Sequence, residues 1–116
     1  MSEESWARVS LRITSSTMTS DEIATMLGRR SAAPPGRPWA TDLTEDSQVG
    51  LADQLTTVKE FLRDRLDVLE NLRECDMDLT IGWTPRAPQD GIALDIEMVT
   101  LLYRVRCAVL LDTYLD

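Results

Sequence analysis

Apolar and polar residues alternate strictly near the start of the chain. The odd-numbered residues from Ala7 to Ile13 are apolar, and the residues between them are polar. This period of two is typical of a strand with one buried and one open face, so we predict a first strand over residues 6–14. The same alternation from Met77 to Trp83 predicts another strand.

Helical spacing marks two segments between these strands. Thr19 followed by Glu22 forms a capping box, and Gly28 suits the residue after a helix end, so we predict a short helix over 20–27. From Gln48 to Cys75 the apolar residues recur mostly every three or four positions. One straight helix of this length would extend about 40 Å, whereas a domain of this size has a radius of gyration near ~14 Å. We therefore expect a bend or a split near residues 63–67.

The remaining elements complete an α+β pattern. Residues 39–43 form a short second strand, Asp95 caps a last helix, and residues 107–115 form the last strand. The apolar positions of that last helix are Ile96, Val99, Leu102 and Tyr103. The order predicts one domain over 1–116 with loops at 29–38 and 84–91. We expect a ferredoxin-like, mainly antiparallel four-stranded sheet with helices on one face and extra helical material between the second and third strands.

Charge and composition restrict the function classes. The 116 residues include 12 Lys and Arg against 20 Asp and Glu, a net charge of −8, and no histidine. The missing histidine excludes Ser-His-Asp and Cys-His pairs, His-ligated zinc and an imidazole base. The acidic balance argues against binding nucleic acid by charge. The acidity lies in residues 41–116, with a net charge of −9, whereas residues 1–40 carry +1.

The same composition predicts a cytoplasmic setting without membrane association. The N-terminus is acidic and lacks the apolar core of a secretory signal, and no apolar run reaches the ~20 residues of a membrane span. Cys75 and Cys107 lie far apart in sequence without a nearby histidine or lysine that would activate them, so two buried, reduced thiols are favoured over a disulfide.

The open face of the predicted sheet is the first candidate interaction surface. If the first strand lies between the third and the last strand, it gathers aromatic and charged side chains. These are Trp6, Arg8, Arg12, Asp78, Asp112 and Tyr114. Such a face is either solvated, with cross-strand ion pairs worth about 0.2–1 kcal/mol each, or a binding or dimer surface, since Trp, Tyr and Arg are enriched in binding hot spots.

Two loops supply further candidate contacts. The loop residues considered are Arg29, Arg30, Arg37, Trp83, Arg86 and Asp90. We interpret the first loop as a plain surface loop. The alternative is an anion contact, since arginine forks match carboxylates and phosphates. Trp83 continues the apolar alternation of its strand, which favours a buried position over a ligand contact.

Carboxylates offer the remaining chemistry. The candidates are Asp76, Asp78, Asp90, Asp95, Glu97 and Asp112. Pairs of carboxylates can perform acid–base catalysis or hold a hard cation. Positions in turns, at helix caps or in solvent explain these carboxylates better than catalysis or cation binding does. No catalytic residue, metal or cofactor is therefore predicted.

Several short motifs resemble the bacterial family known as domain of unknown function 4279. They are the segments 6–13, 21–28, 91–94 and 110–114, together with Trp39 after the first loop. The resemblance implies the predicted fold and a bacterial, intracellular setting. The family brings no established activity, cofactor or catalytic residue.

Three hypotheses about function follow. The first is a non-enzymatic binding protein, such as an immunity-like or inhibitor-like protein, whose acidity steers it to a basic protein partner. The second is a small-molecule-binding or carboxylate-dependent enzymatic domain. The third is a homo-oligomeric structural module, since a slightly positive third and an acidic remainder also permit a homodimer.

Overall fold

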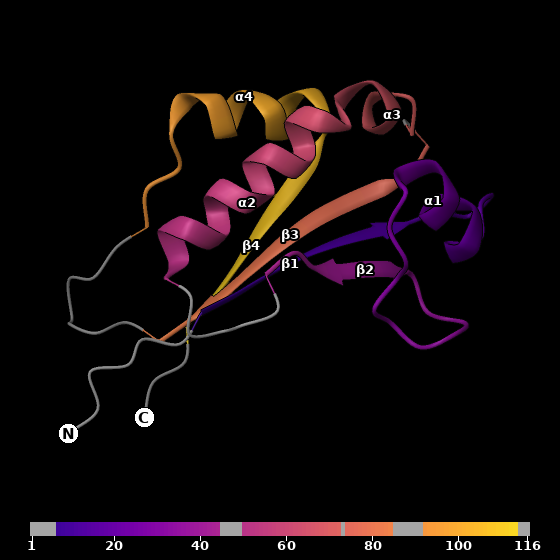
Figure 1. Cartoon of the computed structure of the whole chain (residues 1–116), viewed down its shortest axis with the longest axis horizontal. Coiled ribbons are helices and arrows are strands. Elements are labelled where there is room, and N and C mark those ends of the chain that lie inside the picture. The colour runs from indigo at the N-terminus through magenta and orange to yellow at the C-terminus, as the bar shows by residue number, and fades with distance from the viewer. Residues whose placement is uncertain (1–6, 45–49, 73, 85–91, 114–116) are drawn as a thin grey trace.

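The computed structural model describes residues 7–44, 50–72, 74–84 and 92–113. Within these residues the chain forms a mixed α+β structure (Figure 1). Its elements, in chain order, are β1 (Ala7–Thr14), α1 (Ser20–Leu27), β2 (Trp39–Asp42), α2 (Leu51–Asp64), α3 (Leu66–Glu70), β3 (Asp76–Trp83), α4 (Ile96–Arg104) and β4 (Cys107–Thr113). The predicted α+β class and the order of elements are confirmed.

The four strands form one sheet in the order β2-β1-β3-β4. β1 pairs antiparallel with both β2 and β3, whereas β4 runs parallel to β3. The parallel pair follows from α4, because a helix that crosses over between two strands brings the second strand back in the direction of the first. The ferredoxin-like arrangement is not confirmed, and the prediction that the first strand borders the last strand is wrong.

The local signals for helix ends are confirmed. The Thr19 hydroxyl accepts a hydrogen bond from the Glu22 N–H, and the Glu22 carboxylate accepts one from the Thr19 N–H. Gly28 ends α1 with φ 69°, a left-handed conformation that glycine adopts without strain. Asp95 caps α4 through a 2.8 Å hydrogen bond from the Met98 N–H.

The long helical stretch is split, as its length predicts. Arg65 separates α2 from α3 and has non-helical dihedral angles, φ −117° and ψ 20°. Its guanidinium lies 4.2 Å from the centre of the Phe61 ring and donates a 2.7 Å hydrogen bond to the Leu27 carbonyl. The side chain that marks the break therefore also fastens it to the end of α1.

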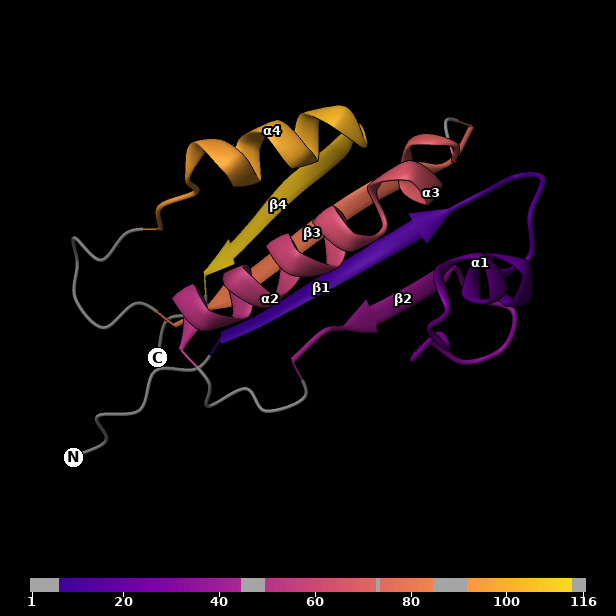
Figure 2. The same ribbon diagram turned by 45° about the horizontal axis from the view of Figure 1, so that its top comes forward.

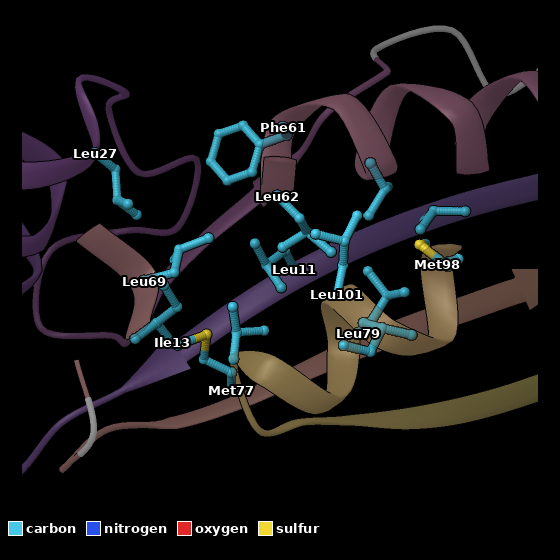
Figure 3. Close-up of a cluster of buried hydrophobic side chains, with 14 of the residues drawn as sticks. Leu11, Ile13, Leu27, Phe61, Leu62, Leu69, Met77, Leu79, Met98 and Leu101 are labelled. Carbon is cyan, nitrogen blue, oxygen red and sulfur yellow. The ribbon is translucent and has the colours of Figure 1, made fainter. Parts of the chain in front are cut away.

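The core lies between the sheet and helices α2, α3 and α4, which share one face (Figures 1 and 2). The odd-numbered residues of β1 and β3 point into it, as the alternation predicts. Figure 3 shows Leu11 and Leu79 of the sheet gathered with Leu62 and Leu101 of the helices. None of the helices in the described residues is long and apolar enough to cross a membrane.

The last helix buries a different face from the predicted one. Its buried residues are Met98, Leu101 and Leu102, with Val105 directly after it. Ile96, Val99 and Tyr103 are exposed, so of the four predicted positions only Leu102 lies in the core. β4 also differs from a core strand, because every residue from Ala108 to Thr113 is exposed.

Candidate functional site

The charged side chains on the open face of the sheet form ion pairs with one another. Arg8 lies 3.6 Å from the Asp42 carboxylate, which also accepts a hydrogen bond from the Ser10 hydroxyl. Arg12 donates to Asp78 at 3.0 Å across β1 and β3. These are cross-strand ion pairs on an exposed face, each contributing about 1 kcal/mol or less. The two arginines predicted to contact a partner are thus already engaged with carboxylates of their own chain.

Strand order changes the surroundings of the other predicted surface residues. Arg8 and Asp112 lie in one row with Gly82 between them, rather than on adjacent strands. Asp78 is less solvated than the sequence suggests: its side chain is 16% exposed, and its Oδ1 atom is buried without a hydrogen-bond partner among the described residues. Trp6 and Tyr114 lie outside the described residues.

The arginines of the first loop divide into two kinds. Arg29 is structural, because its guanidinium donates to the Thr41 hydroxyl at 2.7 Å and to the Asp42 carbonyl at 3.3 Å. Arg30 and Arg37 are exposed and line an open groove of about 750 Å³ between this loop and α1. An open groove with exposed charges fits a surface loop as well as an anion contact.

The second predicted loop lies mostly outside the described residues, and with it Arg86 and Asp90. Trp83 is described and is 8% exposed at the end of β3. Its side chain lies on the helix-covered face of the sheet, as the alternation favours. Trp83 is therefore a core residue in this structure.

Ion pairs turn the charged side chains of α4 toward α2 and α3. Asp95 accepts from Lys59 at 2.6 Å, and Glu97 accepts from Arg63 at 2.6 and 3.0 Å. Glu97 also lies 3.5 Å from Lys59. At the other end of α4, Arg104 makes a two-pronged contact with Glu70 of α3, at 3.0 and 3.2 Å. These contacts fix α4 beside α2 and leave its opposite flank without charged residues.

The network shifts the pKa values of its members. The hydrogen bond from Lys59, followed by that from the Met98 N–H, lowers the pKa of Asp95. The hydrogen bond from Arg63 lowers the pKa of Glu97. The bond to Asp95 raises the pKa of Lys59. A carboxylate with a lowered pKa stabilises the fold above its unfolded-state pKa, about 4, and this contribution disappears as the pH falls through the folded-state value.

We expect the double variant K59Q/R63Q to lose less stability on acidification than the wild type. The variant lacks the cations that lower the pKa values of Asp95 and Glu97, so protonation of these carboxylates costs it less. Urea unfolding at a series of pH values between about 7 and 3 measures the difference. R37Q, which removes an exposed charge without an ion pair among the described residues, is the control and keeps the wild-type slope. Equal slopes for K59Q/R63Q and the wild type would contradict the assignment.

The outer flank of α4 and the edge strand β4 form an exposed apolar surface, which we call the α4–β4 surface. Its members are Ile96, Val99, Tyr103, Val109 and Leu111; Leu110 is also exposed but lies on the opposite, open face of the sheet, beside Thr80. Ile96 is 85% and Tyr103 82% exposed, and Leu111 is 54% exposed. Exposed large apolar side chains that gather on two neighbouring elements are typical of interaction sites.

This surface is not among the predicted interaction surfaces, although the sequence carries a signal for it. α4 carries apolar residues on two flanks, more than one core-facing stripe requires. Residues 107–111 form a continuous apolar run, a pattern typical of a strand covered on both faces. Both features indicate apolar area in excess of what the fold buries.

The two thiols line a smaller groove of about 440 Å³ beside the C-terminal end of α4. Burial, and to a lesser extent the Asp78 carboxylate, raises the pKa of Cys107 to about 12. A thiol with this pKa is a poor nucleophile at neutral pH. No group of three or more acidic or sulfur side chains suited to a metal lies together in the described part of the chain.

No family model, curated protein or solved structure matches the chain. The resemblance to the domain of unknown function 4279 family therefore remains a prediction.

Proposed function

We propose that the chain is a non-catalytic protein-interaction protein that engages its partner through the α4–β4 surface. The observation that carries this proposal is the exposure of the five large apolar side chains of that surface. They come from a helix flank and an adjacent strand that ion pairs and pairing to β3 hold in place. A rigid apolar surface is suited to binding because little conformational entropy is lost when a partner covers it. Tyr103 is of a residue type enriched in hot spots.

The rival small-molecule or enzymatic function has its best location in the groove between α1 and the first loop. The charged residues of that groove are Asp21, Arg30 and Arg37, and all three are exposed. Catalytic acids and bases are usually tuned by burial or by a close charged partner. Among the described residues, none of these three side chains has an ion pair. The groove therefore gives little support to a small-molecule or enzymatic function.

The charge of α2 and α3 favours a basic partner. Asp53, Glu60, Asp64 and Asp67 recur along the exposed side of these helices, and none has an ion pair among the described residues. The basic residues of the same helices are held by Glu97, Asp95, Phe61 and Leu27. This row supports the proposal that an immunity-like or inhibitor-like protein recruits a basic partner by electrostatic attraction.

Affinity capture with matched variants tests the proposed function. Wild-type bait, the double variant I96E/Y103E and the control M26E are compared by quantitative mass spectrometry, with a differently tagged second copy of the chain coexpressed. Met26 is an exposed residue of α1, away from the α4–β4 surface. We expect one bound protein to be retained by the wild type and M26E and reduced at least about tenfold with I96E/Y103E.

Identical retention by all three baits, including retention of the second copy, would overturn the proposal. Repeating the capture at raised salt tests the charge of the partner. Retention of a basic partner falls with salt because its attraction to the acidic row is screened beyond about 10 Å at 0.1 M.

A further inference from the structure

The two edges of the sheet are treated differently. The outer edge of β2 is covered by the preceding loop: the Ala32 N–H donates to the Ala40 carbonyl at 2.7 Å, and the Ala40 N–H donates to the Ser31 hydroxyl at 3.1 Å. β4 pairs with β3 on one side and has no strand on its other side in the part of the chain that the structure describes. An uncovered edge strand is a template for pairing with another strand.

β4 also lacks the features that usually protect an edge. Natural edge strands are short, or carry lysine, proline or inward-pointing charges. β4 has seven residues, Cys-Ala-Val-Leu-Leu-Asp-Thr, and its central residues are apolar. The protected β2 strand, in contrast, has four residues. The exposed edge is therefore the longer and more apolar of the two.

The flank of α4 that points away from α2 lies toward the free edge of β4. Glu97 and Arg104 point to α2 and α3, and helical spacing sets Val99 on the opposite flank of α4. Since α2 packs over β1 and α4 over β4, the direction from α2 across α4 leads to the free edge (Figure 2). Val99 thus lies on the side of α4 nearer the edge strand, whose Val109 and Leu111 lie on the helix-covered face of the sheet.

We propose that a second copy of this chain covers the α4–β4 surface, with the two β4 strands paired antiparallel so that one sheet runs through both copies. This inference rests on the proposed function and assigns the α4–β4 surface to a second copy, whereas a basic partner would meet the acidic row of α2 and α3. The pairing is centred on Val109, which lies opposite the same residue of the second copy. On the helix-covered side Cys107 then lies opposite Leu111, and the exposed flanks of the two α4 helices approach each other.

Charge complementarity selects this partner and this register. Arg106 directly precedes β4 and Asp112 lies near its end; both are exposed, and neither has an ion pair among the described residues. Arg106 lies just outside the strand, with φ 58°, and antiparallel pairing about Val109 brings it close to Asp112 of the other copy. Parallel pairing would instead oppose like charges. A two-fold axis generates the antiparallel arrangement, since a symmetric dimer uses the same patch on both chains.

The net charge of −8 on each copy does not oppose this contact strongly. The acidic row lies on α2 and α3, separated from the β4 edge by α4. At physiological ionic strength charges are screened over about 8 Å, so the local pairs at the strand ends outweigh the distant repulsion.

Charge exchange tests the dimer and its register together. Sedimentation velocity over a wide protein concentration range compares the wild type with R106D, D112R and the double variant R106D/D112R. Each single variant sets like charges opposite each other twice in a symmetric dimer. We expect each to raise the dimer dissociation constant at least about tenfold, and the double variant to restore it to within about threefold of the wild type. V109K, which sets two lysines at the centre, abolishes the dimer.

Circular dichroism checks that every variant keeps the wild-type fold. A wild-type chain that stays monomeric at the highest concentration would overturn the inference, as would a dimer that neither single variant weakens, or weakened single variants without recovery in the double variant. If the wild type is monomeric while I96E/Y103E loses another captured protein, the second copy is the wrong partner and the proposed function stands. If the wild type is monomeric and I96E/Y103E retains every captured protein, both proposals fail.

Discussion

Replacement of Trp39 by alanine is expected to destabilise the fold by roughly 3–5 kcal/mol, the usual cost of removing a buried aromatic side chain. Trp39 is fully buried at the start of β2, opposite Ile13 of β1. Its indole N–H also donates a 3.0 Å hydrogen bond to the Arg29 carbonyl, which anchors the first loop. A domain of this size has a total stability of about 5–15 kcal/mol, so W39A is expected to be folded only marginally or not at all.

Two further variants separate the contributions of Trp39. W39F keeps most of the ring volume but leaves the Arg29 carbonyl without its indole donor, so we expect a smaller loss of about 1–3 kcal/mol. M26A, a truncation at an exposed position of α1, should change stability by less than about 0.5 kcal/mol. Urea unfolding followed by circular dichroism measures all three. A W39A variant as stable as M26A would show that Trp39 is not a core residue.

Local patterns predicted most of the elements because each depends on neighbouring residues. Alternation predicted β1 and β3, and the capping box with Gly28 predicted α1. The break between α2 and α3 was predicted from length alone, and it occurs at Arg65. No glycine or proline marks that position. The position is stabilised instead by contacts with Phe61 and Leu27, which only the folded chain brings near.

The order of the strands could not be predicted in the same way. It depends on which strands pair across long sequence separations, and the wrong order misplaced Asp112 relative to Arg8. The apolar residues of α4 and β4 were recognised as apolar, but the pattern does not say what covers them. A run such as 107–111 predicts burial on both faces, whereas the single chain leaves it exposed at an edge. That discrepancy is itself the strongest indication of an interface.

The role of Gln54 in stabilising the fold was also not indicated by any sequence pattern, because a polar residue on a helix is normally expected at the surface. It is 1% exposed on α2. Its side-chain amide accepts from the Val9 N–H at 3.2 Å and donates to the Ala7 carbonyl at 2.8 Å. β2 pairs with β1 only from Ser10 to Ile13. The glutamine thus takes the place of a strand beside the part of β1 that β2 does not reach.

We expect Q54L to destabilise the fold by about 2–4 kcal/mol, because a buried backbone group that loses its partner costs roughly 1–3 kcal/mol. The leucine keeps the volume, so a large loss reports the hydrogen bonds rather than a cavity. T56L, an apolar change at an exposed position of the same helix, should stay within about 0.5 kcal/mol of the wild type. If Q54L matches T56L in urea unfolding, the amide is dispensable.

Q54E separates the donor from the acceptor at the same position. The ionised carboxylate can still accept from the Val9 N–H, but it cannot donate to the Ala7 carbonyl, and its charge is buried. Protonation restores the donor and removes the charge. Stability of Q54E relative to the wild type should therefore rise as the pH falls from about 7 toward 5, the direction expected for a buried carboxyl whose pKa burial raises. A pH-independent difference would contradict the burial of this side chain against β1 and the role assigned to the Gln54 amide.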